Sequence, residues 1–200
     1  MGDRKTEEVR VRDDDFGDFM TEFISESDRA AVILGAARVE ALLGQILEKF
    51  LLPCVGSKDE LLEGDAPLST LSSRIKICHR LGIIDDQFAQ LLNTFRRLRN
   101  GFAHEVTHSS LSVGSARDRV ASMADAFEKA EFLGRICSYI GGEMERDPSD
   151  PGVVFRAVMG IFHLELSRIQ GLVRKVHRAD QISIVDHVCH LRGSSKEIEQ

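Results

Sequence analysis

The sequence has no tryptophan, a single tyrosine and only four prolines among its 200 residues. Because the bases of single-stranded nucleic acids stack on aromatic rings, this scarcity argues against an aromatic platform for such bases. The longest apolar run near the N-terminus covers residues 30–37, whereas a membrane span needs roughly 20 residues. The first residues also lack a hydrophobic signal sequence. We therefore expect a cytoplasmic protein with no membrane partner.

Paired cysteines are missing as well. Cys54, Cys78, Cys137 and Cys189 are widely spaced and form no Cys-x-x-Cys motif, which is typical of reduced thiols in the cytoplasm. Residues 187–190 place two histidines around Cys189, but a zinc site would need further ligands from elsewhere in the fold. We prefer a terminal helix with surface histidines, and we expect neither a metal nor a cofactor.

The composition is that of a folded domain with a modest excess of acid. Apolar residues make up 42% and charged residues 29%, so the chain can bury a core. The 26 lysines and arginines face 32 aspartates and glutamates, which gives a net charge of −6. This balance argues against a uniformly basic nucleic-acid coat but leaves room for a local basic site.

Apolar residues recur at helical spacing along the chain. The pattern predicts a helix around residues 16–24 and a second, largely apolar helix from Ser27 or Asp28 to about Leu52. Ser69 or Thr70 caps a third helix that ends before Gly82, and Asp85 caps a fourth. Further helices are predicted over about 117–145, 153–176 and 182–191, with a short helical turn at 57–63 and a loop at 105–115.

No segment alternates with the period of a strand. The sequence therefore predicts an all-α fold, a compact helical bundle of about six to eight helices. We expect residues 1–14 to form a charged flexible leader and residues 15–115 to form a helical core. Residues 116–200 would either complete this bundle or form a second lobe.

The most unusual segment covers residues 95–105. Its apolar residues lie on one face of the expected helix, and Asn100 and His104 share another face, with Arg96 one turn before them. Residues 66–104 contain six basic and two acidic side chains, a local charge of +4 in a chain of −6. Such a surface suits phosphate, because guanidinium groups bind it bidentately. We name Arg96, Arg97, Arg74 and Lys76 as candidate anion ligands; alternatively, the arginines pair with acids on other helices.

Two stretches resemble the mannitol operon repressor family. One begins with residues 28–37, and the other runs from Asp59-Glu60-Leu61-Leu62 through Ala66-Pro67-Leu68-Ser69-Thr70 to Arg99-Asn100-Gly101-Phe102-Ala103-His104. Together they cover roughly residues 27–105. The resemblance implies an all-helical protein that represses genes of mannitol uptake. The chain nevertheless shows no helix-turn-helix with a polar recognition helix, because the helix after Gly82 buries an apolar stripe and begins with Asp85-Asp86.

Residues 99–104 also resemble the Arg-x4-His motif of HEPN domains, many of which are metal-independent ribonucleases that act as dimers. That resemblance implies Arg99, Asn100 and His104 as catalytic candidates. The RNA 2′-OH would be the nucleophile, His104 the acid or base, and Arg99 the group that stabilises phosphorane charge. A structural role for Asn100 and His104 in binding a neighbouring loop is the simpler alternative.

From these observations we expect a regulator of transcription that acts through a protein partner and self-association, without specific DNA binding of its own. The alternative is a HEPN-type ribonuclease or RNA-binding protein. We also expect a homodimer with the Arg96–His104 helix near its interface, because the helices at 28–52 and 153–176 are apolar on more than one face.

Overall fold

The computed structural model describes residues 13–54, 56–104, 110–127 and 131–176. These residues form seven α-helices and no strand, which confirms the predicted all-α bundle. The helices are α1 (Asp13–Ser25), α2 (Asp28–Phe50), α3 (Leu71–Arg80), α4 (Asp86–His104), α5 (Gly114–Asp125), α6 (Glu131–Glu143) and α7 (Pro151–Leu172). The helix predicted over 182–191 and the first 12 residues of the leader lie outside the described residues.

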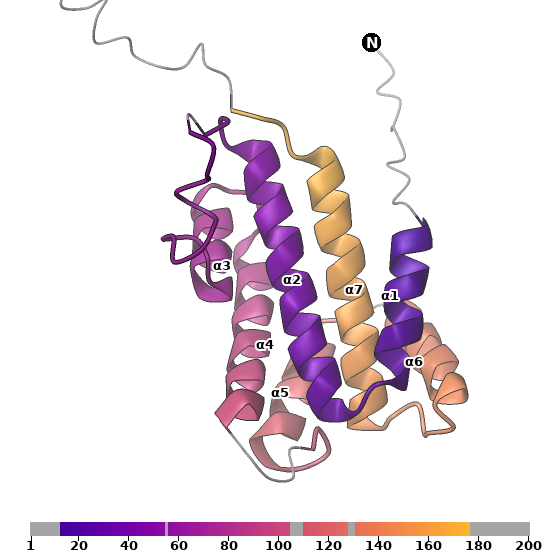
Figure 1. The fold of residues 1–200 in the computed structure, drawn as a ribbon. Helices are drawn as coiled ribbons and strands as arrows, with labels where there is room; N and C mark the ends of the chain where they lie inside the picture. The colour runs from indigo at the N-terminus through magenta and orange to yellow at the C-terminus, as the bar shows by residue number, and fades with distance from the viewer. Residues whose placement is uncertain (1–12, 55, 105–109, 128–130, 177–200) are drawn as a thin grey trace, which may run out of the picture.

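The centre of the bundle is the pair formed by α2 and α7, which run side by side in the same direction (Figure 1). Polar contacts cross between the two helices at both ends and in the middle. Asp28 lies against Arg156, Arg38 against His163, and Lys49 against the carbonyl groups of residues 170 and 171. The contacts follow one another in the same order along both helices, as expected for a parallel pair.

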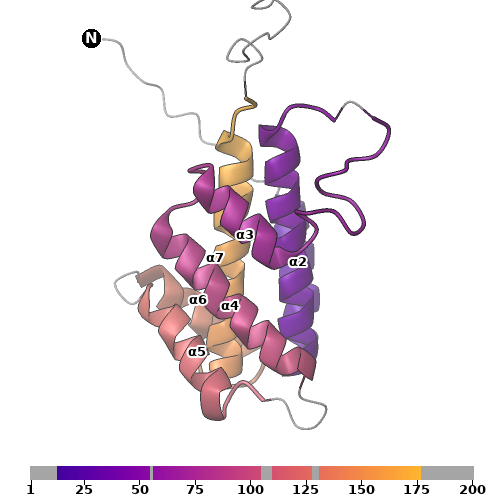
Figure 2. The same cartoon turned by 90° about the vertical axis from the view of Figure 1, so that its left-hand side faces the viewer.

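The other helices cover this pair from several sides. The hairpin of α3 and α4 packs across α2, as Figure 2 shows, and α1, α5 and α6 pack against α7. Phenylalanines join the layers at the core: Phe95 of α4 lies 6.0 Å from Phe155 and 6.3 Å from Phe162 of α7, measured between ring centroids. Helices α5 and α6 thus pack on the α7 side of the central pair, and α5 also contacts α4.

Local sequence signals set most of the helix ends. The Ser27 side chain accepts from the backbone N–H of Ala30 at the start of α2, and Thr70 and Ser73 form a capping box at the start of α3. Asp85 accepts from the N–H of Phe88 at the start of α4. Gly82 has a φ of +69°, which suits a glycine between α3 and α4.

The short helical turn predicted at 57–63 agrees with the structure at Asp59–Glu63, where the backbone N–H of Glu63 donates to the carbonyl of Asp59 at 3.0 Å and the Asp59 carboxylate accepts from the N–H groups of Leu61 and Leu62. Another prediction was wrong. The predicted helix over 117–145 is two helices, α5 and α6. One unbroken helix would extend past α7, whereas the break lets both parts pack against it. Helix α1 begins at Asp13, and the extent of the leader stays a prediction.

The second turn of α7 carries a buried arginine. Arg156 is fully buried and donates to the carbonyl oxygens of Phe23, Glu26 and Gly152 and to the Asp28 carboxylate. Burial lowers the pKa of Arg156, and the neighbouring Asp28 carboxylate opposes that shift. Arg156 therefore ties the turn between α1 and α2 to the first turns of α7.

Helix α2 is long and apolar enough to cross a membrane, and among the described helices it alone passes that test. Of the qualifying window, 56% is buried inside the bundle. The central position of α2 explains this hydropathy, because a helix covered on several sides is apolar on several faces. The covering helices also bury much of the apolar surface on which the dimer was predicted, so the homodimer stays a prediction.

Candidate functional site

The candidate site from the sequence lies on the C-terminal half of α4. The core side of this helix is occupied by the buried residues Leu92, Phe95, Leu98 and Phe102. Arg97 and Arg99 are exposed, and Arg96 and Asn100 are half-buried. We call Arg96, Arg97, Arg99 and Asn100 the α4 arginine face.

The three arginines of this face form no ion pair within the described part of the chain. Arg96 donates through Nε to Oδ1 of Asn93 at 3.3 Å, and Arg99 donates through Nη1 to Oδ1 of Asn100 at 3.3 Å. Both partners are neutral amides on α4 itself. The alternative in which acids on other helices neutralise the arginines thus finds no support among the described residues of one chain.

Arg74 is engaged in the fold. Its guanidinium donates to three carbonyl oxygens: Nε to Leu68 at 2.8 Å, Nη1 to Glu40 at 2.7 Å and Nη2 to Leu62 at 3.3 Å. Gly44 leaves the space for it, because a Cβ at that position would lie 2.8 Å from Nη1. These bonds join α3, α2 and the loop between them, so we leave Arg74 out of the proposed anion-binding set.

Lys76 is exposed on α3, the helix that packs against α4. No hydrogen bond or ion pair between described residues joins it to the α4 arginine face. Its role as an anion ligand stays a prediction.

The structure adds one arginine that the sequence analysis missed. Arg119 of α5 donates through Nη1 to Ser115, and the same atom lies 3.9 Å from where a Cβ on Gly101 would be. Arg119 thus lies over α4, one turn beyond Arg97. The contact is tertiary, so nothing in the local sequence of α5 could have revealed it.

The catalytic alternative depends on His104, which is the last residue of α4. Its side chain lies outside the described residues, so the geometry of the Arg-x4-His motif beyond Arg99 and Asn100 stays a prediction. The same holds for the histidines and the cysteine at 187–190. Among the residues that are described, no group of three or more His, Cys, Asp or Glu could hold a metal ion.

Comparisons with known proteins give one resemblance. No family model matches this chain, and no curated protein sequence matches it. Among solved structures, the chain is similar to the X-ray structure of the MtlR–HPr complex from Escherichia coli. The two chains share 17% sequence identity with a TM-score of 0.49, over 78% of this chain and 99% of the other. This similarity does not assign the chain to a family.

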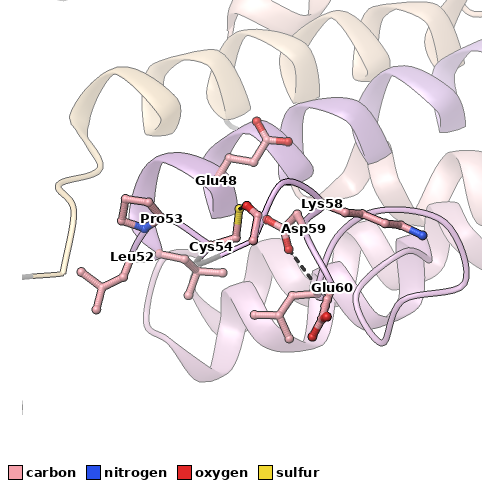
Figure 3. A pocket seen from close by; sticks show the side chains of 10 residues that line it. Glu48, Leu52, Pro53, Cys54, Lys58, Asp59 and Glu60 are labelled. Carbon is pink, nitrogen blue, oxygen red and sulfur yellow. Dashed lines mark hydrogen bonds between the residues drawn. The ribbon is translucent and has the colours of Figure 1, made fainter.

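Two further hollows lie away from α4. One is a pocket of about 490 Å³ between the end of α2 and the loop that follows it (Figure 3). There the Cys54 thiol donates to the carbonyl of Gly56 at 3.3 Å, and Glu48, Asp59 and Glu60 also line the hollow. The other, of about 530 Å³, is an apolar groove between α1, α6 and α7.

Proposed function

We propose that this chain is a regulator of transcription, similar to mannitol operon repressors, that acts by binding a protein partner at the α4 arginine face. The observation that carries the proposal is the set of three neighbouring arginines without an acid partner among the described residues. Guanidinium groups in this state favour a partner with carboxylates or phosphates, because such groups complete their hydrogen bonds bidentately.

The opposite end of α4 supports a protein partner over DNA. In a helix-turn-helix, the N-terminal residues of the second helix contact the base edges. Here Asp85 caps that end, and the Asp86 side chain is 85% exposed. Two acids at this position would face the phosphates of the duplex. The regulator therefore works without specific DNA binding of its own, in the cytoplasm, and self-association belongs to the same proposal.

A complementation experiment tests this function. Transcript levels are measured in cells that lack the gene and carry either the wild-type protein or the triple variant Arg96→Glu, Arg97→Glu, Arg99→Glu. The wild type is expected to restore the transcripts that change on deletion, whereas the triple variant restores none of them. The matched control places three glutamates at Lys58, Arg174 and Lys175, which are exposed elsewhere, and is expected to behave as wild type.

The same experiment supplies the DNA to be tested. Purified protein is titrated onto the regions upstream of the affected genes in a gel-shift assay at physiological salt, because phosphate contacts depend strongly on salt. We expect no specific shift by the protein alone. Tight, sequence-specific binding would overturn the indirect mechanism, and full activity of the triple variant would remove the α4 arginine face from the function.

A further inference from the structure

The apolar groove is formed by α1 and α6, which both pack against α7 (Figure 1). It lies on the other side of the central helix pair from α3 and α4. Met20, Ile24, Ile136 and Leu164 are among the apolar side chains that line it. The groove has a volume of about 530 Å³, and no residue of α4 lines it, so it is separate from the α4 arginine face.

Two aromatic side chains on α6 border this groove and remain in contact with solvent. Phe132 is 46% exposed and Tyr139, the only tyrosine of the chain, is 66% exposed. They are seven residues apart, so they lie on the same side of α6. Exposed aromatic side chains that gather on an apolar groove mark a surface for interaction.

Glycine leaves the groove open on the α1 side. A Cβ at Gly17, which lines the groove, would have no atom within 4 Å. At the floor, Gly160 lets Met20 lie close to α7, with the Met20 sulfur 3.5 Å from where a Cβ would be. The groove thus has room for side chains that another molecule inserts.

Helix α1, which borders the groove, carries acids on its outer side. Its sequence contains no lysine or arginine. The exposed Asp18 and Glu22 are one helical turn apart; they lie outside the groove lining, which on α1 consists of Phe16, Gly17, Met20, Thr21 and Ile24. Neither acid forms an ion pair among the described residues. The α6 wall contributes one cation, Arg135.

We propose that this groove binds an amphipathic helix of a partner protein, with its apolar face between α1 and α6 and its basic residues over α1. The apolar lining with its exposed aromatics matches the helix-in-groove mode of recognition, in which one face of a helix supplies the anchors. The acids of α1 select a basic helix, because complementary charge at a rim determines which partner is accepted.

Peptide binding to the full-length protein tests the proposal. Two fluorescent helical peptides share one leucine-rich face and carry either lysine or glutamate at their polar positions. Fluorescence anisotropy is expected to show saturable binding of the lysine peptide, at least about tenfold tighter than the glutamate peptide. The double variant Asp18→Lys, Glu22→Lys is expected to reverse this preference.

A groove-filling variant locates the site. Gly17→Leu places a side chain into open space, and loss of a helical glycine favours α1, so the protein should stay folded. We expect it to weaken binding of the lysine peptide about tenfold. The matched control is Gly134→Leu on α6, where a Cβ also meets nothing within 4 Å and which lies outside the groove lining.

Three outcomes would overturn the proposal. The first is equal binding of the two peptides, and the second is unchanged binding to Gly17→Leu. The third is a dimer of the wild-type protein that Gly17→Leu converts to a monomer in light scattering, because the groove would then be filled by a second copy of this chain.

Discussion

The buried Arg156 guanidinium lies 3.3 Å from the carboxylate of Asp28, the first residue of α2. Asp28 also accepts from the backbone N–H of Leu111 at 3.2 Å and lies 3.9 Å from Arg146. A Cβ at Gly152 would lie 3.0 Å from the same carboxylate, so glycine makes room for the pair. One acid therefore holds together the start of α2, the start of α7 and the segment before α5.

Removing the charge of Asp28 is expected to destabilise the protein strongly. Asp28→Asn removes the only carboxylate that bonds the buried Arg156 cation among the described residues, and breaking a buried ion pair in this way costs about 3–5 kcal/mol. The free energy of unfolding is measured by urea denaturation. The control is Arg146→Ala, whose side chain is 48% exposed, and whose removal should cost below about 1 kcal/mol. Equal stability of Asp28→Asn and wild type would contradict the structural role of this pair.

The cysteines are expected to react at very different rates. Burial raises the pKa of the Cys78 thiol to about 12, and Arg74 opposes this shift only in part. At pH 8 Cys78 is therefore almost entirely protonated, and the thiolate is the reactive form. Cys54 is exposed and should be alkylated first, whereas Cys78 should react only after unfolding. Mass spectrometry after a short iodoacetamide pulse checks the order; early labelling of Cys78 in folded protein would show that its surroundings open.

An anion that binds the α4 arginine face is expected to stabilise the folded protein. A ligand that binds only the folded state raises the melting temperature by mass action. Thermal melting is compared in sulfate and chloride at equal ionic strength for the wild type, Arg97→Ala and Arg99→Ala. The excess stabilisation by sulfate should shrink in both variants.

Equal stabilisation by sulfate in all three proteins would show a nonspecific salt effect and would contradict an anion site on this face. The predicted homodimer adds a separate readout in the same samples. Light scattering at micromolar concentration should give the mass of a dimer, and a monomer would remove the interface argument.

The ribonuclease alternative has its own test. If the protein is a regulator, the wild type in the presence of a chelator should cleave RNA no faster than the His104→Ala variant does. Metal-independent cleavage by the wild type that His104→Ala and Arg99→Ala both abolish would instead establish the HEPN-type chemistry, because that mechanism needs both side chains.

The sequence predicted most of the helices because their signals are local. Ser27, Thr70 and Asp85 cap helices wherever an apolar stripe follows them, and Gly82 ends one. The break between α5 and α6 was missed because both parts have helical periodicity. The break is explained by the packing of both parts against α7, which is a tertiary contact.

The candidate site was predictable in part for the same reason. Three arginines on one short segment are visible in the sequence, but the role of a single arginine depends on residues far along the chain. Arg74 is held by carbonyl groups of α2 and the following loop, and Arg119 lies over Gly101 of another helix. Arg156 lies among apolar residues of α7, and the sequence pattern there does not indicate that it pairs with Asp28.

Site-specific photo-crosslinking in cells tests most directly whether the α4 arginine face binds a protein. A photoreactive amino acid replaces Ala103, which is exposed one turn after Arg99, and a control carries it at the exposed Leu61. Irradiation should give a defined adduct from position 103 that protease removes, that nuclease leaves unchanged, and that disappears when Arg96, Arg97 and Arg99 are changed to glutamate. A nuclease-sensitive adduct at position 103 would show that this face binds nucleic acid and would contradict the account.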